Sequence, residues 1–570
     1  MSKGVMTIDG QTVEIENERN VLELIRKAGI VLPTFCYHSE LSIHGGCRMC
    51  IVEDDRGSLI PSCSEEPRNG MIIHTNTRRV RRYRRNILEL LLANHSRDCT
   101  ICFNSGNCRL QELARSFNIS SIRFMNTAHS PHMDHSSKCI SKDPNRCILC
   151  GDCVRICNEV QNVGAIDFAH RGSDMHISTP FGVPLAESVC VGCGQCAAVC
   201  PTGAIIVKND INKVWRALDN QETFVTVQVA PAVRVALGQE FGLGDGENSI
   251  GYIVAALHRL GFDKVFDTST SADLTVIEES REFVQRLQSW HDMPLFTSCC
   301  PAWINYVEKH YPEIMPHVST CRSPMQMFAS VLADEYRKVP GKRHVHVAIM
   351  PCTAKKFEAA RDEFVTDGQP NVDFVLTTQE LVQMIRQSGI LWEDLEPEGV
   401  DNPFSVYTGA AVIFGVTGGV TEAVLRELAD DHGPTALKKL AFVGVRGQDG
   451  LKETKITVGG KELSIAVVSG LGNASALIED LKSGVRKYHF VEVMACPGGC
   501  VCGAGQPVVP LSHRAARGKG LYSADLLTSI KRSEDNPLMA TLYDGLLKGR
   551  NHDLLHVHYP GHKGHHNHAA

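Results

Sequence analysis

Short runs of apolar and β-branched residues open the chain. Val5–Ile8 and Thr12–Ile15 flank the dipeptide Asp9-Gly10, which favours a tight turn. The residues that follow, 20–28, have helical spacing. The pattern predicts a β-hairpin followed by a helix.

Further along, apolar runs alternate with helical stretches, as in Val225–Ala230, Ile253–Leu260 and Val345–Met350. Strands that alternate with helices predict an α/β architecture with layered sheets. The longest uncharged run, 402–421, is interrupted by four glycines and lacks the continuous apolar character of a membrane span. We therefore expect this run to lie in a buried core.

Length and composition indicate several globular domains. A chain of 570 residues, at about 150 residues per domain, predicts three to five domains. The 43% hydrophobic and 21% charged residues exclude wholesale disorder. A net charge of -6 gives no support to nucleic-acid binding. The first residues lack an export signal, so we expect a cytoplasmic protein without a membrane anchor.

Cysteine is the outlier of the composition, because the chain contains 23 of them in clusters. In a reducing compartment, clustered cysteines indicate metal binding rather than disulfides. In the first group, ten residues separate the first two cysteines. This spacing fits either a zinc ion or a [2Fe–2S] cluster. The second group, H-x3-C-x2-C-x5-C, is open between zinc and a cluster with one histidine ligand. These groups are Cys36, Cys47, Cys50 and Cys63, and His95, Cys99, Cys102 and Cys108.

The third group is a repeat of C-x2-C-x2-C-x3-C, whose second copy begins 43 residues after the first. This is the run of bacterial two-cluster ferredoxins, in which the fourth cysteine of each run binds the other cluster. Asn158 stands where the pattern has proline, whereas Pro201 follows the second run. The predicted cubane ligands are Cys147, Cys150, Cys153 and Cys200 for one cluster, and Cys190, Cys193, Cys196 and Cys157 for the other. Accessory clusters in series indicate an electron path that ends in the remaining part of the chain.

Three segments in that part resemble the signatures of [FeFe]-hydrogenases: Thr297–Trp303, Met350–Lys356 and Glu492–Cys500. Together with the accessory modules, the chain is similar to the large monomeric clostridial type. The resemblance implies a multidomain α+β and α/β fold. Its expected domains are a β-grasp [2Fe–2S] ferredoxin (1–80), a His(Cys)3-ligated [4Fe–4S] module (81–122), a two-[4Fe–4S] ferredoxin module (138–210) and a two-lobed α/β H-cluster domain (211–550). Composition predicts that residues 551–570 form a disordered His-rich tail, with adventitious Zn or Ni binding as the alternative.

The resemblance also implies the cofactors and the reaction, 2H⁺ + 2e⁻ ⇌ H₂. The cofactors are one [2Fe–2S] cluster, three accessory [4Fe–4S] clusters and the H-cluster, a cubane linked to a diiron unit with CO, cyanide and azadithiolate ligands. Four cysteines would hold the cubane, and the last would bridge to the diiron unit: Cys300, Cys352, Cys496 and Cys500. The expected partners are ferredoxin and the maturation proteins that insert the diiron unit. Alternatives are a subunit of an NAD(P)H-linked electron-bifurcating complex, a hydrogen sensor and an iron–sulfur assembly protein.

Pocket and relay residues follow from the same resemblance. Lys355 would donate to a cyanide nitrogen, and Met350 and Met494 would pack against the diiron unit. Glu279, Glu282 and Arg286 share one helix face, and by spacing alone they are an ordinary ion-pair stripe. The resemblance instead implies a proton relay through Cys299, Glu279, Ser319, Glu282 and Arg286. Further pocket positions implied by resemblance alone are Ala230, Pro231, Ser323, Phe414 and Gly415.

Other features stand outside these assignments. Cys139, Cys321 and Cys502 are left over, and we expect them to be small buried hydrophobic residues. Met325 and Ala504 depart from the family pattern near the expected pocket. Six arginines between residues 78 and 85 predict a solvated helix face, with some of the arginines capping cluster loops. Docking of an acidic ferredoxin is the alternative.

Overall fold

The computed structural model describes residues 4–126, 132–288, 294–337, 341–429, 431, 444–447, 449–509 and 511–560. The chain divides into two compact units. Unit 1 comprises residues 1–160, 164–190 and 195–206, and unit 2 comprises residues 161–163, 191–194 and 207–570. None of the helices in the described ranges combines the length and apolar character needed to cross a bilayer.

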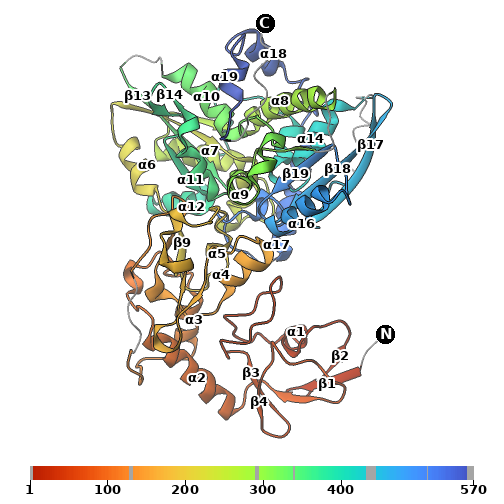
Figure 1. The fold of residues 1–570 in the computed structure, drawn as a ribbon. Coiled ribbons are helices and arrows are strands. Elements are labelled where there is room, and N and C mark those ends of the chain that lie inside the picture. Colours follow the sequence, from red (N-terminus) through yellow and green to blue (C-terminus); the bar gives the residue numbers. More distant parts are fainter. Residues whose placement is uncertain are drawn as a thin grey trace. The chain divides into compact units, whose positions relative to one another are not determined.

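Unit 1 opens with a five-stranded sheet in the order β2-β1-β5-β3-β4 (Figure 1). The predicted hairpin is confirmed, because β1 and β2 pair antiparallel around Asp9-Gly10. The predicted helix is α1 (Val21–Lys27), and the side chain of Asn20 caps its N-terminus by accepting from the Glu23 amide. The strands are β1 (Gly4–Ile8), β2 (Gln11–Ile15), β3 (Ile51–Asp54), β4 (Leu59–Pro61) and β5 (Ile72–His74).

The arginine-rich segment forms α2 (Arg78–Ala93). Its first arginines are exposed, as predicted for a solvated face, but Arg84 is buried and donates to the Ile51 carbonyl at 2.6 Å. The solvated-face prediction is therefore wrong for Arg84, whose hydrogen bond links α2 to β3. The remaining elements of unit 1 are short: α3 (Arg109–Ser116), β6 (Ile140–Lys142), α4 (Asp152–Arg155), the π-helical turn η3 (Ile156–Val160), β7 (Asp167–Ala169), β8 (His176–Ser178), α5 (Gln195–Ala198) and β9 (Ile205–Val207).

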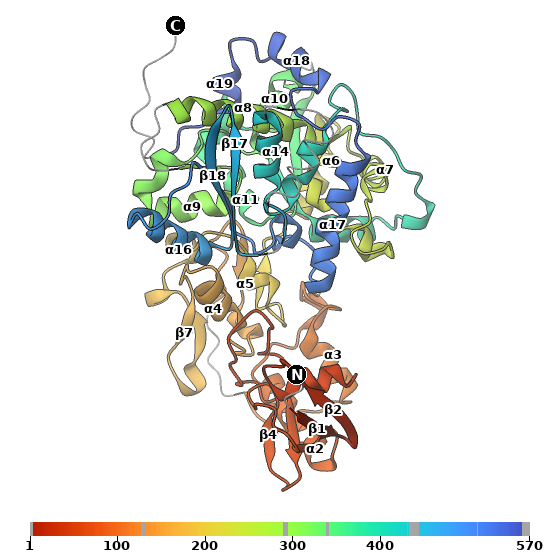
Figure 2. The same cartoon turned by 90° about the vertical axis from the view of Figure 1, so that its right-hand side faces the viewer.

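Unit 2 contains two four-stranded sheets, and this confirms the layered α/β prediction. The first sheet is parallel throughout, in the order β11-β10-β13-β16. In the second sheet, β12-β19-β18-β17, only the edge strand β17 runs antiparallel. Figure 2 shows β17 beside its neighbour β18. The strands are β10 (Thr223–Val229), β11 (Lys264–Asp267), β12 (Leu295–Phe296), β13 (Arg343–Met350), β16 (Phe374–Thr377), β17 (Leu451–Val458), β18 (Lys461–Ser469) and β19 (Phe490–Met494).

Helices cover these sheets, so the central strands β10 and β13 are buried almost throughout, including their polar residues such as Gln228 and His346. The predicted buried run is confirmed from Thr408 to Thr421, where every residue is buried, whereas Asn402 and Pro403 are exposed. The helices include α6 (Ile211–Leu218), α7 (Ile250–Leu260), α8 (Ser269–Gln288), α9 (Pro301–His310), α10 (Pro324–Tyr336), α11 (Ala354–Ala359), α12 (Thr378–Gln387), α13 (Gly409–Val412), α14 (Gly419–Leu428), α16 (Leu471–Lys482) and α17 (Leu511–Leu527).

The C-terminal segment contradicts part of the expected disordered tail. Residues 551–560 are described, with α18 (Pro537–Asp544) before them and α19 (Asn551–Leu555) at their start. Leu555 is fully buried, and its carbonyl accepts from the Arg322 amide at 2.8 Å. The apolar residues among the histidines explain this order, because they complete a core with α8 and α10. The tail histidines from His562 onward lie outside the described residues.

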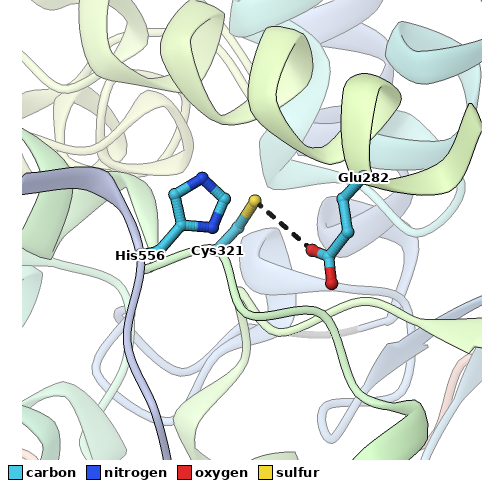
Figure 3. A group of neighbouring side chains, drawn as sticks. All are labelled: Glu282, Cys321 and His556. Atoms are coloured by element: carbon cyan, nitrogen blue, oxygen red, sulfur yellow. Dashed lines mark hydrogen bonds between the residues drawn. The ribbon is translucent and has the colours of Figure 1, made fainter. Parts of the chain in front are cut away.

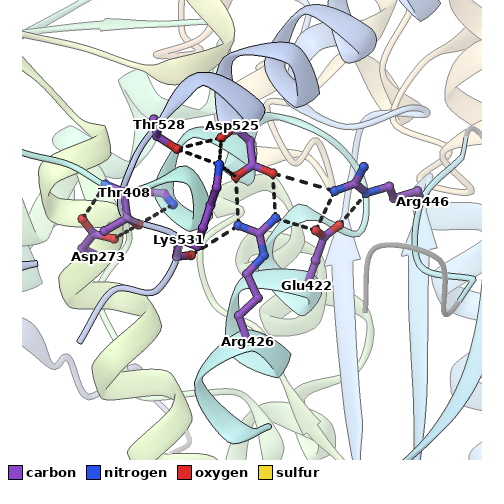
Figure 4. Close-up of polar contacts among 9 residues, drawn as sticks. Asp273, Thr408, Glu422, Arg426, Arg446, Asp525, Thr528 and Lys531 are labelled. Atoms are coloured by element: carbon purple, nitrogen blue, oxygen red, sulfur yellow. Dashed lines mark hydrogen bonds and ion pairs between the residues drawn. The ribbon is translucent and has the colours of Figure 1, made fainter. Parts of the chain in front are cut away.

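A network of buried ion pairs and hydrogen bonds holds α17 and the residues that follow it against α14 and α8 (Figure 4). Asp525 of α17 accepts two hydrogen bonds from Arg426 of α14, at 3.0 and 2.7 Å. Arg426 also donates to Glu422, which pairs with Arg446. On α8, the fully buried Asp273 accepts from Thr408, Ser533 and Asn536, while burial raises its pKa to about 7.

Candidate functional site

The three signature segments of unit 2 lie where parallel strands end. Cys300 follows β12 and precedes α9, Cys352 follows β13, and Cys496 follows β19. Cys500 begins the short helical turn η13 (Cys500–Cys502). Because ligands of α/β proteins gather beyond the carboxyl ends of strands, both sheets contribute loops to one site.

The four cysteines of this site are partly buried and lie near one another. Burial raises the pKa of Cys352 to about 12, and the neighbouring Cys300 raises it further. Burial likewise raises the pKa of Cys496, with contributions from Cys352, Cys300 and Cys500. A thiol must lose its proton to bind metal, and the nearby Lys355 ammonium acts to lower the pKa of Cys300, Cys352 and Cys500. The four thiols therefore fit a metal site.

Glycines bring the second and third signature loops into contact. A Cβ on Gly503 would lie 2.2 Å from the Pro351 carbonyl oxygen, and a Cβ on Gly505 would lie 2.9 Å from it. Only residues without a side chain permit this approach. The departure at Ala504 is therefore a buried methyl group between two positions that require glycine.

The relay positions lie on α8 and on the segment after η9 (Pro312–His317). The Ser319 hydroxyl donates to the Glu282 carboxylate at 2.7 Å. Arg286, one helical turn further, donates to Glu282 at 2.6 Å and to the Val318 carbonyl at 3.1 Å. The side chain of Arg286 is 23% exposed and that of Glu282 is 10% exposed, so the chain of groups reaches toward solvent.

Glu279 is the buried member of this set. Its side chain is fully buried, and neither carboxyl oxygen has a hydrogen-bond partner among the described residues. Burial raises its pKa to about 8, with further contributions from the charges of Glu282 and Glu492. Burial also raises the pKa of the Cys299 thiol, and the charge of Glu279 adds to this effect. A carboxyl group with such a pKa can both accept and donate a proton near neutral pH.

Lys355 is buried on α11, as its position beside Cys352 predicts. Its ammonium group donates to Glu358 at 2.7 Å and to the Cys299 carbonyl at 3.2 Å. The pair orients the lysine while leaving it capacity for a further hydrogen bond. Glu358 escaped the sequence analysis, although its spacing of three residues from Lys355 on a helix could have revealed it.

The apolar pocket positions fall into two buried clusters. Phe414 and Met494 pack together with Cys299 and Cys500. Ala230 and Met350 belong to the main core, which also contains Met325, the second departure from the family pattern. Gly415 faces Ala232, and a Cβ there would lie 3.0 Å from the alanine Cβ. The other two positions are buried at element starts: Pro231 begins η7 (Pro231–Val233), and Ser323 caps α10 by accepting from the Gln326 amide.

One cysteine of the second ferredoxin run belongs to unit 2. The segment 191–194 carries Cys193, and the Thr353 hydroxyl donates to the Gly192 carbonyl at 2.8 Å. A Cβ on Gly194 would lie 2.4 Å from Thr353 Oγ1, so the contact requires glycine. Cys193 is close enough to raise the pKa of Cys496. A predicted accessory-cluster ligand therefore lies near the four-thiol site.

Unit 1 contains the other predicted ligands. One cavity is lined by a complete predicted set, Cys147, Cys150, Cys153 and Cys200, together with Lys142. The buried Lys142 places a positive charge beside these thiols. Of the second set, Cys157 lies in η3, Cys196 lies in α5 and Cys190 precedes the segment 191–194.

His95 and the first cysteine group also lie in unit 1. Burial lowers the pKa of His95 to about 4, so the ring is neutral, and its Nδ1 atom has no partner among the described residues. A neutral imidazole with an unpartnered nitrogen fits a metal ligand. Cys99 begins η1 (Cys99–Ile101), Cys102 follows it, and Cys108 caps α3.

The thiols of the first group pair with each other. Cys36 interacts with Cys47, and Cys50 interacts with Cys63. These interactions lower the pKa of Cys47 and Cys50 and raise that of Cys36 and Cys63. The backbone also approaches these sulfurs, since the Phe35 amide donates to Cys47 at 3.4 Å. Amides directed at sulfur are typical of iron–sulfur sites.

Two of the three leftover cysteines are buried, as predicted. Cys139 and Cys321 are 2% and 0% exposed, whereas Cys502 is only half-buried. Cys321 is more than a packing residue, because its Sγ lies 3.8 Å from the Glu282 carboxylate. Sequence reasoning missed this contact and the position of His556, which has a ring nitrogen within 4.8 Å of both Cys321 Sγ and Glu282.

Comparisons with known proteins assign families to most of the chain. Residues 223–504 match the family described as iron only hydrogenase large subunit, C-terminal domain, and residues 511–561 match iron hydrogenase small subunit. Residues 5–78 match a 2Fe-2S iron-sulfur cluster binding domain, and residues 146–204 match a 4Fe-4S dicluster domain. Residues 84–123 match the NADH-ubiquinone oxidoreductase-G iron-sulfur binding region.

Relatives and solved structures agree with these matches. The chain is 41% identical to the NADP-reducing hydrogenase subunit HndD of Solidesulfovibrio fructosivorans, over 98% of this chain and 99% of that protein. It is 34% identical to iron hydrogenase 1 of Clostridium pasteurianum, over 97% of this chain and 99% of that protein. A structure of a variant of the [FeFe]-hydrogenase HydA1 from Chlamydomonas reinhardtii matches with a TM-score of 0.55 and 37% identity, covering 62% of this chain and all of that one.

Proposed function

Because the chain belongs to the iron-only hydrogenase family, we propose that it interconverts H₂ with protons and electrons at an H-cluster in unit 2. The cubane ligands of this proposal are Cys300, Cys352, Cys496 and Cys500, with Cys500 as the bridge to the diiron unit. The single observation that carries the proposal is the convergence of these four partly buried cysteines from loops of both sheets. When bound, the H-cluster supplies the metal centre at which H₂ is formed or split.

The residues around the thiols have separate tasks in this proposal. The Lys355 ammonium group, oriented by Glu358, donates a hydrogen bond to an anionic ligand of the cluster. Phe414 and Met494 exclude water from the same side of the site as Cys299. The rest of the pocket around the diiron unit is formed by Ala230, Pro231, Ser323, Met350 and Gly415.

The proton route starts at the Cys299 thiol and passes to the Glu279 carboxyl. The Ser319 hydroxyl then hands the proton to Glu282, since its hydrogen bond to that carboxylate is already formed. Arg286 holds Glu282 in place at the more exposed end. The raised pKa of Glu279 supports this order, because the group can be protonated or ionised near neutral pH.

Electrons reach the site through the accessory clusters. We assign a [2Fe–2S] cluster to residues 1–80, a His(Cys)3-ligated [4Fe–4S] cluster to 81–122 and two [4Fe–4S] clusters to 138–210. The catalytic domain begins at 211. The segment 191–194 supports the last transfer step, because it brings Cys193 beside the thiol of Cys496.

The electron partner of the proposal is ferredoxin. The exposed arginines at the start of α2 support it, because they offer positive charge to an acidic carrier. The relative HndD favours a second candidate, in which this chain is a subunit of an NADP-reducing complex. Co-purification of a flavoprotein with the natively produced chain would establish that second candidate, and its absence would favour ferredoxin. Maturation proteins would insert the diiron unit in either case.

Anaerobic H₂ evolution by the matured protein tests the function. With reduced ferredoxin or a reduced viologen, we expect turnover in the natural sequence and its loss in Cys299→Ser. Infrared bands of metal-bound CO and cyanide should be present in both proteins. Bands without turnover in the natural sequence would contradict the catalytic proposal, and absent bands after maturation would contradict the H-cluster assignment.

A further inference from the structure

A cluster of three possible metal ligands lies at the outer end of the relay. The Cys321 thiol, the Glu282 carboxylate and the His556 imidazole offer donor atoms that all lie within 4.8 Å of one another. Figure 3 shows the three side chains pointing toward one another from α8, from the segment before α10 and from the C-terminal segment. We infer that this cluster is a binding site for a zinc ion, and that zinc bound there inhibits hydrogen turnover.

The backbone builds this site rather than leaving it to flexible side chains. Cys321 and His556 face each other across an antiparallel β-bridge. Two hydrogen bonds flank the bridge: the Val557 amide donates to the Thr320 carbonyl, and the Arg322 amide donates to the Leu555 carbonyl, each at 2.8 Å. Residues opposite each other in such a bridge hold their side chains close together.

The hydrogen bonds of His556 determine which ring nitrogen carries the proton. Its Nε2 atom lies 3.0 Å from the Glu278 carboxylate, which when ionised can only accept a hydrogen bond. The proton is therefore on Nε2, and the unprotonated Nδ1 accepts a hydrogen bond from the Thr320 hydroxyl at 2.9 Å, which a metal ion at Nδ1 displaces. A histidine whose second nitrogen donates to a carboxylate is the usual arrangement around bound metals.

The donor set suits zinc in both chemistry and charge. Thiolate, imidazole and carboxylate are the ligand types of zinc sites, and three of them leave a fourth position for water. Zinc ligands of this kind lie about 3.3 to 3.7 Å apart, and the distance from Cys321 Sγ to Glu282 is 3.8 Å. One zinc ion with a thiolate and a carboxylate is neutral overall. Binding replaces the Cys321 thiol proton, which is released to the buffer.

Zinc at this position would act on catalysis through Glu282. That carboxylate accepts the Ser319 hydroxyl, so a zinc ion bound to it removes the acceptor for the outward proton. This second part of the inference rests on the proposed function of the relay. The binding itself does not, because it depends only on the three donors.

Binding is tested first, on the full chain with its iron–sulfur clusters loaded. The tail histidines His562, His565, His566 and His568 are replaced by alanine so that they do not compete. Equilibrium dialysis with Zn²⁺ should then give one tight site per chain. X-ray absorption at the zinc edge should show one sulfur at about 2.3 Å with nitrogen and oxygen at about 2.0 to 2.1 Å.

Substitutions identify the ligands. Cys321→Ser and His556→Gln should each weaken zinc binding at least about 10-fold. His558→Ala is the matched control, because it removes an exposed imidazole of the same segment and should leave affinity unchanged. A spectrum without sulfur, a spectrum with several sulfurs, or unchanged binding in Cys321→Ser would each overturn the site.

Inhibition is tested in the matured enzyme, with each variant compared to its own zinc-free rate. Zinc should slow H₂ evolution in the tail-substituted protein, and Cys321→Ser should need at least about 10-fold more zinc for the same fractional loss. Full turnover with zinc bound would overturn the inhibitory part. An absence of turnover before zinc is added would instead contradict the proposed function and leave the binding result standing.

Discussion

The protonation of Glu279 offers a direct check on the geometry of the relay. In the unfolded chain a glutamate has a pKa of about 4.3, whereas burial raises the pKa of Glu279 to about 8. At about 1.4 kcal/mol per unit, the difference corresponds to about 5 kcal/mol. The side chain is fully buried, so no solvent screening reduces this value.

The sign of the pH dependence follows from proton binding. Between about pH 4.3 and 8 the folded state holds a proton that the unfolded state has released, so this group favours folding less as the pH rises. Its contribution is complete below about pH 4.3 and is lost as the pH passes through 8. Glu279→Gln should therefore gain stability relative to the natural sequence at pH 9, compared with pH 6.

Infrared difference spectroscopy measures the protonation directly. The natural sequence should lose a carbonyl stretch of a protonated carboxyl group as the pH is raised through about 8. The same band should be missing from Glu279→Gln at every pH, and Glu278→Gln is the control that should keep it. Asp273, whose pKa is about 7, should titrate in both proteins. A natural protein with no titrating carboxyl band that is absent from Glu279→Gln would refute the buried placement of Glu279.

Three further outcomes are expected. Ser319→Ala should lower H₂ turnover by about 10²-fold or more with unchanged iron content. Ser319→Thr keeps the hydroxyl and should retain most of the turnover. Equal rates in the two variants would contradict the proposed relay. Asp525→Ala should cost about 3 to 5 kcal/mol in urea unfolding because it leaves Arg426 buried without this partner. Arg446→Ala, at a side chain 29% exposed, should cost about 1 kcal/mol or less. Gly503→Ala should lower iron retention in unit 2 because its Cβ would meet the Pro351 oxygen at 2.2 Å, whereas Gly399→Ala, with open space around it, should not.

Local structure and the candidate ligands were readable from the sequence. The hairpin at Asp9-Gly10, the helix capped by Asn20 and the strands β10 and β13 all appear where the residue pattern predicts them. Turn, cap and strand preferences act over a few residues, so the sequence expresses them directly. The repeat of C-x2-C-x2-C-x3-C is local in the same sense, and Cys147, Cys150, Cys153 and Cys200 line one cavity.

Interpretation by local pattern had clear limits. Arg84 belongs to a run of arginines, yet it is buried because β3 offers a carbonyl acceptor. The segment 551–560 is rich in histidine, yet Leu555 anchors it in the core. In both places a contact with a residue distant in sequence determines whether the side chain is buried, and composition does not reveal that contact.

The sequence by itself determined which residues can bind iron and the order of the modules that carry them, because ligand spacing is a local property. Only the tertiary structure decided that Glu279 is buried without a partner, that Glu358 orients Lys355, and that Cys321 and His556 meet at Glu282. These features depend on contacts between residues up to hundreds of positions apart. Burial and convergence change the pKa and the ligand chemistry of a side chain, and both arise only when the chain has folded.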